Sequence, residues 1–148
     1  MRILLDTNVI CRLAQKSHPF HSAAENAVFK LRENGHDLCL VPQILYEYWV
    51  VATRPASENG LDMAPAVVDT ALDLWLELFT LFRDERGIFS EWRELMRQYD
   101  VRGKSAHDAR LVAAMQRHGI QSLLTFNIAD FQRYVGIDLL DARSLRMP

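Results

Sequence analysis

The stretch Ile3-Leu4-Leu5-Asp6-Thr7-Asn8 decides the fold class of this chain of 148 residues. Its three consecutive apolar residues do not alternate with polar ones, which is typical of a short strand in a parallel sheet that helices cover on both faces. The polar residues that follow end the strand and lead into a short helix. Similar apolar runs at 38–41, 78–82, 122–126 and 137–140 predict up to four further strands.

Helical patterns separate these predicted strands. Apolar residues recur at helical spacing in 9–14, 20–34, 43–54, 64–76, 86–99 and 106–118, and a glycine follows two of these segments. Residues 55–62 form the clearest loop. Because strands alternate with helices, the sequence predicts the α/β class. We expect a three-layer α/β/α sandwich around a short parallel sheet, with a strand order that the pattern leaves open.

Length and composition limit the possible classes of protein. We expect a single domain over residues 1–148, because the chain is long enough to bury one core. Seventeen basic and nineteen acidic side chains give a net charge of −2, which disfavours binding to nucleic acid by bulk positive charge. No run resembles a membrane helix, and Asp6 interrupts any secretory signal, so we expect a cytoplasmic protein. Cys11 and Cys39 are then buried thiols.

Two acidic residues lie where a parallel α/β sheet binds its ligands. Asp6 directly follows the first predicted strand, and Asp108 lies at the start of the helix predicted over 106–118. Ligands of such sheets bind outside the carboxyl ends of the strands, which is where the following helices begin. Each acid alone also has a structural explanation, Asp6 as a helix cap and Asp108 as a partner of the helix dipole.

Three further polar positions belong to this group. Glu47 lies within the apolar stripe of the helix predicted over 43–54, where a carboxylate is costly unless a cation compensates it. Arg54, two turns later, is one such partner. Asn127 and Asp130 follow the fourth predicted strand, where an Asx turn with a helix cap is the structural alternative.

Taken together, these positions favour a metal site over four separate structural roles. Asp6, Glu47, Asp108 and Asp130 come from four elements and would meet at one edge of the sheet, where carboxylates raise one another's pKa. Bound Mg²⁺ or Mn²⁺, which prefer oxygen ligands, removes this conflict. We expect Asp6, Asp108 and Glu47 to be the metal ligands. The cation would activate a water for attack on a phosphodiester, which predicts a metal-dependent nuclease.

The same residues resemble those of the PIN-domain ribonucleases, and most closely the VapC-like toxins of bacterial toxin–antitoxin pairs. Four parts carry the resemblance along nearly the whole chain, namely 3–9, Glu47, 107–114 and 124–131. The similarity implies a PIN-like fold and an endoribonuclease that hydrolyses RNA with Mg²⁺ or Mn²⁺. It also implies a cognate antitoxin that blocks the site, and a homodimer.

The fourth acidic position departs from the family pattern. The family often has an acid where this chain has Asn127, whose amide supplies no negative charge. Asp130, one helical turn later, is the candidate to replace it, directly or through a water. Thr7, Asn8 and Thr125 are candidates for orienting the metal ligands or the attacking water.

Two other functions remain open at this point. An aspartyl-nucleophile phosphatase would use Asp6, but the haloacid-dehalogenase-like pattern requires a second aspartate where this chain has Asn8. A non-catalytic binding module of the same fold would pair the acids with arginines. Lys104 and Arg110 flank Asp108, and we interpret them as part of a solvated face, with contact to RNA phosphates as the alternative.

Aromatic side chains occur mostly at the spacing of core residues. We interpret them as core or dimer contacts, and stacking on nucleic-acid bases is the alternative. They are Tyr46, Tyr48, Trp49, Trp75, Phe79, Phe82 and Trp92.

Overall fold

The computed structural model describes residues 1–145, and these contain one parallel sheet of five strands. The predicted parallel sheet is confirmed, because all neighbouring strand pairs are parallel. Residues 146–148 of the predicted domain lie outside the described residues. The strands, in the spatial order β3-β2-β1-β4-β5, are β1 (Arg2–Leu5), β2 (Asp37–Leu40), β3 (Thr80–Leu81), β4 (Ser122–Thr125) and β5 (Asp138–Asp141).

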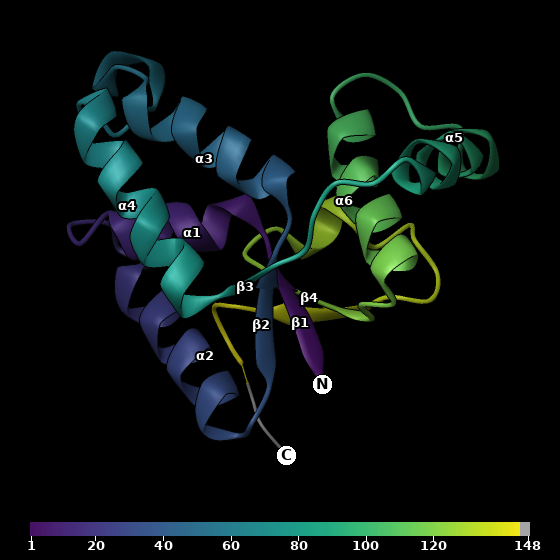
Figure 1. Ribbon diagram of the computed structural model, residues 1–148, viewed down its shortest axis with the longest axis horizontal. Helices are drawn as coiled ribbons and strands as arrows, with labels where there is room; N and C mark the ends of the chain where they lie inside the picture. Colours follow the sequence, from purple (N-terminus) through teal and green to yellow (C-terminus); the bar gives the residue numbers. More distant parts are fainter. Residues whose placement is uncertain (146–148) are drawn as a thin grey trace.

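Helices cover both faces of this sheet, as the α/β prediction requires. Figure 1 shows the helices between residues 7 and 78 on one side of the sheet, and α5 (Gly87–Tyr99) and α6 (Ser105–His118) on the other, which gives the predicted three layers. Two 3-10 helices, η1 (Ala56–Glu58) and η2 (Ile128–Asp130), lie in connections. The α-helices of the described chain are α1 (Thr7–Ala14), α2 (His21–Glu33), α3 (Pro42–Thr53), α4 (Pro65–Leu78), α5 (Gly87–Tyr99) and α6 (Ser105–His118).

The core forms around the central strand β1. Ile3, Leu4 and Leu5 are fully buried, and β1 lies between β2 and β4 in the middle of the sheet. Val112 and Met115 of α6 belong to the same core and are also fully buried. Burial on both faces explains why the strand sequence does not alternate between apolar and polar residues.

The end of α4 differs from the prediction. The sequence predicts a strand over 78–82, but α4 continues to Leu78 and β3 has only two residues. The backbone N–H of Phe79 still donates to the carbonyl oxygen of Trp75, so the helix takes the first part of the apolar run. The loop predicted over 55–62 contains η1. A search of the described helices finds none with the length and apolar character needed to span a membrane.

The aromatic residues divide between core and surface. Tyr48, Trp75 and Phe79 are buried, which confirms their assignment to the core. Tyr46 is 61% exposed and lies outside the core, which leaves a dimer contact as the prediction for this residue. It shares a helix with Tyr48 but points to solvent, because two positions along a helix turn a side chain to a different face. The remaining three, Trp49, Phe82 and Trp92, are partly buried.

Gly60 closes the connection between α3 and α4 where no room is left for a side chain. A Cβ atom there would lie 1.8 Å from the carbonyl oxygen of Arg54. We expect Gly60→Ala to lower the free energy of unfolding by about 3 kcal/mol, because the loop backbone must move to accept the methyl group. Urea denaturation measures this change.

Gly103→Ala is the matched control for this steric effect. The φ of Gly103 is +61°, which disfavours a side chain, but no atom would lie within 4 Å of a Cβ. We expect a cost of only about 1 kcal/mol from the backbone conformation. Equal costs for the two substitutions would contradict the steric explanation.

Candidate active site

The ends of β1 and β4 bring two of the predicted polar residues together. Leu5 pairs with Leu124, and the backbone N–H of Asp6 donates to the carbonyl oxygen of Leu124 over 2.9 Å. Asp6 and Thr125 therefore leave neighbouring strands at the same edge of the sheet. This is the edge at which open parallel sheets bind their ligands.

Asp6 is held by three hydrogen bonds and is only 7% exposed. Its Oδ1 accepts from the backbone N–H of Thr7 over 2.7 Å, which is the helix-cap interaction. Its Oδ2 accepts from the hydroxyl of Thr125 over 2.7 Å and from the amide of Asn8 over 3.1 Å. A helix cap requires only the first of these bonds. The other two hydrogen bonds restrict the orientation of the carboxylate further than capping requires.

The electrostatic surroundings of Asp6 oppose its charge. Burial raises the pKa of Asp6 to about 7. The hydrogen bonds from Thr125 and Thr7 lower this pKa, and the negative charges of Asp108 and Glu47 raise it. The acids predicted to meet at this edge therefore act on one another in the folded chain.

Glu47 of α3 is held by uncharged partners. Its Oε2 accepts from the hydroxyl of Thr7 over 2.6 Å, and its Oε1 accepts from the amide of Gln43 over 2.7 Å. The alternative ion pair with Arg54 is not formed. Arg54 instead donates to the carbonyl oxygen of Asn59, and Glu47 has no ion pair within residues 1–145.

Gln43 links Glu47 to α6 and is a residue that the sequence analysis missed. Its Nε2 also donates to the carbonyl oxygen of His107 over 2.8 Å, and its Oε1 accepts from Arg110 over 3.1 Å. Arg110 is partly exposed and also pairs with Asp84 at the surface. The available signal was a polar residue one turn before Glu47 on a helix rich in apolar residues.

Asp108 lies in the first turn of α6, close to its predicted place at the helix start. Burial raises the pKa of Asp108 to about 6, and the charges of Asp130 and Glu47 raise it further. Asp130 is the last residue of η2 and is exposed. Asn127 precedes η2, and its backbone N–H donates to the hydroxyl of Thr125 over 2.9 Å. The Asn127–Asp130 segment thus lies beside both β4 and Asp108.

These acids form a region of negative charge and not a closed metal cluster. No three His, Cys, Asp or Glu side chains within residues 1–145 lie close enough together to enclose a metal ion. In the same part of the chain, none of Asp6, Glu47, Asp108 and Asp130 forms an ion pair. Mg²⁺ keeps several waters and often binds through one or two carboxylates, so these oxygen donors fit a hydrated cation.

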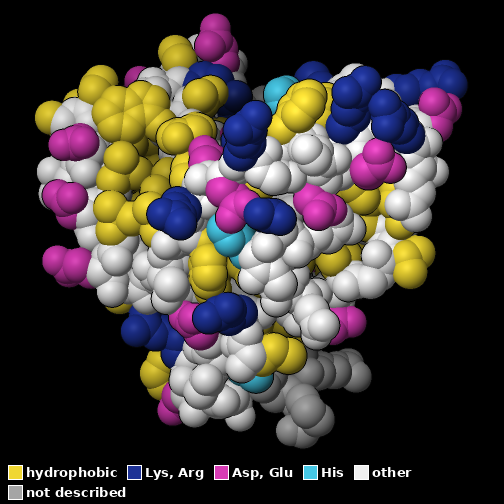
Figure 2. Space-filling model, turned by 45° about the vertical axis from the view of Figure 1, so that its right-hand side comes forward, with side chains coloured by type: hydrophobic (Ala, Val, Ile, Leu, Met, Phe, Trp, Pro, Cys, Tyr) yellow, Lys and Arg dark blue, Asp and Glu magenta, His cyan; other side chains and the backbone are white. Residues whose placement is uncertain are grey.

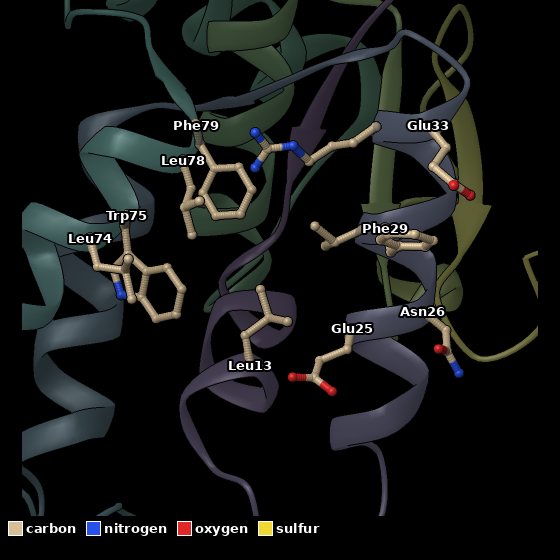
Figure 3. A pocket seen from close by; sticks show the side chains of 11 residues that line it. Leu13, Glu25, Asn26, Phe29, Glu33, Leu74, Trp75, Leu78 and Phe79 are labelled. Atoms are coloured by element: carbon tan, nitrogen blue, oxygen red, sulfur yellow. The ribbon is translucent and has the colours of Figure 1, made fainter.

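A large apolar cavity lies away from the acids. It has a volume of about 840 Å³ and lies between α1, α2 and α4. Figure 3 shows Trp75 and Phe79 on one side of it and Phe29 on the other, with Leu13 between them. None of the four acids lines this cavity, so it is separate from the candidate active site.

Comparison with known proteins was made by sequence. The family model described as the PIN domain matches residues 3–137, a range that includes all four acids. Ribonuclease VapC48 of Mycobacterium tuberculosis is 26% identical over 145 residues, covering 92% of this chain and 94% of that protein. VapC ribonuclease Mb1869c of Mycobacterium bovis is 28% identical over 142 residues, covering 93% of this chain and 98% of that protein.

Comparison by structure agrees on the fold. The crystal structure of VapBC2 from Rickettsia felis, bound to a DNA fragment from their promoter, matches with a TM-score of 0.72. The match covers 95% of this chain and 98% of that chain at 16% identity, which supports the three-layer fold alone. Since the family model spans most of the chain, from the first strand to the start of the last, this chain belongs to the PIN domain family.

Proposed function

We propose that residues 1–148 form a single PIN-like nuclease domain, an endoribonuclease that hydrolyses RNA with Mg²⁺ or Mn²⁺. One observation supports this most strongly. The charges of Asp108 and Glu47 raise the pKa of Asp6, and those of Asp130 and Glu47 raise the pKa of Asp108. None of the four acids has an ion-pair partner within residues 1–145. A bound cation balances carboxylates that raise one another's pKa in this way.

Relatives with names that state an activity support the choice of RNA as substrate. VapC48 and Mb1869c are both named as ribonucleases, and both align over nearly their full length. The resemblance to VapC-like toxins extends the proposal to the toxin of a toxin–antitoxin pair. Its partners would be a cognate antitoxin and a second copy of the chain in a homodimer.

In the proposed mechanism, Asp6 and Asp108 would hold the cation, and Glu47 would be a direct or water-mediated ligand. When bound, the cation supplies the charge that lowers the pKa of a water and stabilises the leaving oxygen. Thr125 and Thr7 hold the carboxylates of Asp6 and Glu47 through hydrogen bonds of 2.7 and 2.6 Å. Carboxylates fixed in this way bind a cation with little rearrangement. No covalent intermediate forms on the protein.

The two alternative functions have less support. A phosphatase with Asp6 as nucleophile would use a second acid two positions later, but Asn8 stands there and donates its amide to Asp6. A binding module would hold the acids with arginines. Arg110, which is close to this site, is instead engaged with Gln43 and Asp84.

Replacing Asp6 tests the proposed chemistry directly. We expect Asp6→Asn to reduce Mg²⁺-stimulated cleavage of single-stranded RNA by more than roughly 100-fold, because the loss of a metal ligand exceeds the effect of losing a supporting residue. A gel assay with end-labelled RNA measures the rate. Asp100→Asn is the control, because Asp100 is exposed and paired with Arg102, and its cleavage rate should not change. Undiminished cleavage by a folded Asp6→Asn protein would exclude the mechanism.

The raised pKa of Asp6 also predicts how stability depends on pH without metal. Asp6 has a pKa of about 7 in the folded chain against an ordinary value of 3.8, so the folded state retains the proton between these values. Stability therefore falls as the pH rises from about 4 to about 7, by a total on the order of 2–4 kcal/mol, and then levels off.

Thermal unfolding between pH 5 and pH 8 measures this dependence. We expect the Tm of the metal-free protein to fall over this range, and to fall less for Asp6→Asn. At pH 8, Mg²⁺ should raise the Tm of the unmodified protein more than that of the variant, because a ligand that binds only the folded state stabilises it. A Tm that rises with pH in the metal-free protein would contradict the assignment.

A pair of substitutions tests which residue supplies the fourth acid. If Asp130 takes this role, Asp130→Asn should lower the cleavage rate by about 10-fold, the lower end of the range for supporting groups at metal sites. Adding Asn127→Asp, which places an acid at the other end of η2, should then restore most of the rate. An unchanged rate for Asp130→Asn would show that three acids are sufficient.

A further inference from the structure

A second cavity lies next to the candidate active site, on the side of α5. It has a volume of about 580 Å³ and lies between the β3–α5 connection, α5 and α6. Its lining combines apolar, aromatic and charged side chains. These are Glu85, Arg86, Ile88, Phe89, Trp92 and Arg110.

Two aromatic rings of this cavity differ in their freedom. The indole N–H of Trp92 donates to the carbonyl oxygen of Ala106 over 2.9 Å, which fixes this ring against the start of α6. Phe89 is 61% exposed, and its ring lies 6.0 Å from that of Trp92 with an angle of 32° between the planes. Phe89 therefore offers an open aromatic surface beside a fixed one, which suits the stacking of a flat ring.

The charge around this cavity is suited to a polyanion. Arg86 forms no ion pair within residues 1–145, while Arg110 pairs with Asp84 and Arg117 with Glu85. One positive charge is left unbalanced. Figure 2, in which the right-hand side of Figure 1 is turned forward, shows Lys and Arg side chains gathered at the upper right, with Asp and Glu side chains among them.

Direct contacts connect this cavity to the acids. Arg110, in its wall, donates to Gln43, and Gln43 donates to Glu47 over 2.7 Å. On the other wall, Trp92 is fixed to the carbonyl oxygen of Ala106, two residues before Asp108 in α6. A single residue, Gln43, thus separates the cavity from a predicted metal ligand. An RNA strand held at the acids would therefore have this cavity beside it.

We propose that this cavity binds one unpaired nucleobase of a single-stranded RNA substrate, with the base stacked on Phe89 and Trp92. Arg86 would contact a phosphate of the same strand. The inference rests on the proposed function, because it names a subsite beside the same acids. Single-stranded RNA fits because its bases are free to leave the stack, whereas paired bases are not.

Binding to a cleavage-deficient protein tests this subsite apart from catalysis. Metal-free Asp6→Asn protein is titrated with a fluorescently labelled single-stranded RNA of eight nucleotides of mixed sequence. We expect Phe89→Ala, added to Asp6→Asn, to weaken binding roughly 5- to 100-fold, which is the range for the loss of one stacked base. Phe29→Ala is the matched control, because Phe29 is 60% exposed but lies at the apolar cavity away from the acids. The affinity of the Phe29→Ala variant for the RNA should equal that of the Asp6→Asn protein.

A set of RNA strands that each lack one base identifies the contact. One of these abasic strands should bind the Phe29→Ala protein as weakly as the complete strand binds the Phe89→Ala protein. Phe89→Ala should lose nothing further with that strand, because the base and the ring would form one interaction. The affinities of the two variants for every strand would be equal if the cavity held no base.

Each other result has a defined meaning. Binding that is indifferent to Phe89, or binding to no strand at all, overturns the subsite, whereas the proposed nuclease is tested separately by the cleavage assay on Asp6→Asn. Sedimentation of both variants tests whether a second copy of the chain, instead of a base, occupies the cavity. A monomer formed only by Phe89→Ala, with unchanged RNA affinity, would assign the cavity to contact with a second copy of the chain and overturn the subsite.

Discussion

A buried carboxylate at the end of β1, which has no ion-pair partner within residues 1–145, is the feature on which the rest of the site depends. Hydrogen bonds from Thr7, Asn8 and Thr125 hold Asp6, yet its pKa stays raised to about 7. An asparagine or serine would cap α1 as well without this electrostatic cost. Capping therefore explains a polar residue at this position but does not explain an acid. The proposed cation would account for both the charge of Asp6 and its close positioning.

The two helical layers are connected through Gln43, which makes the geometry of the acids a property of the whole fold. Gln43 lies on α3, and it binds Glu47 on its own helix and the first two turns of α6 through His107 and Arg110. Glu47 and Asp108 therefore keep their relative positions only while α3 and α6 stay in register. A buried amide suits this purpose because it donates and accepts at once and adds no charge to a crowded region.

The features of this structure that depend on local sequence were predicted better than those that depend on contacts between residues far apart in the chain. The apolar run of β1 and the acid after it were readable because each depends on residues close in sequence. Strand order was not readable, since an apolar run does not specify its neighbours. The role of Gln43 was missed because its partner His107 is 64 residues away and a glutamine on a helix is common. The strand predicted over 78–82 is shorter in the structure because its apolar residues also suit a helix, and α4 continues to Leu78.

Chemistry and substrate selection occupy different parts of this fold. The acids lie at the edge that the parallel sheet creates, so their positions follow from the pairing of β1 with β4 and from the helices that begin there. The cavity with Phe89 lies outside that edge, between a connection and α5. Side chains there can change without altering the sheet, since connections tolerate substitution better than the core does. With the proposed cation at the acids and the proposed base at Phe89, the contacts that choose the substrate would not be those that hold the cation. One hydrolytic site could then serve PIN domains that differ in the RNA that they accept.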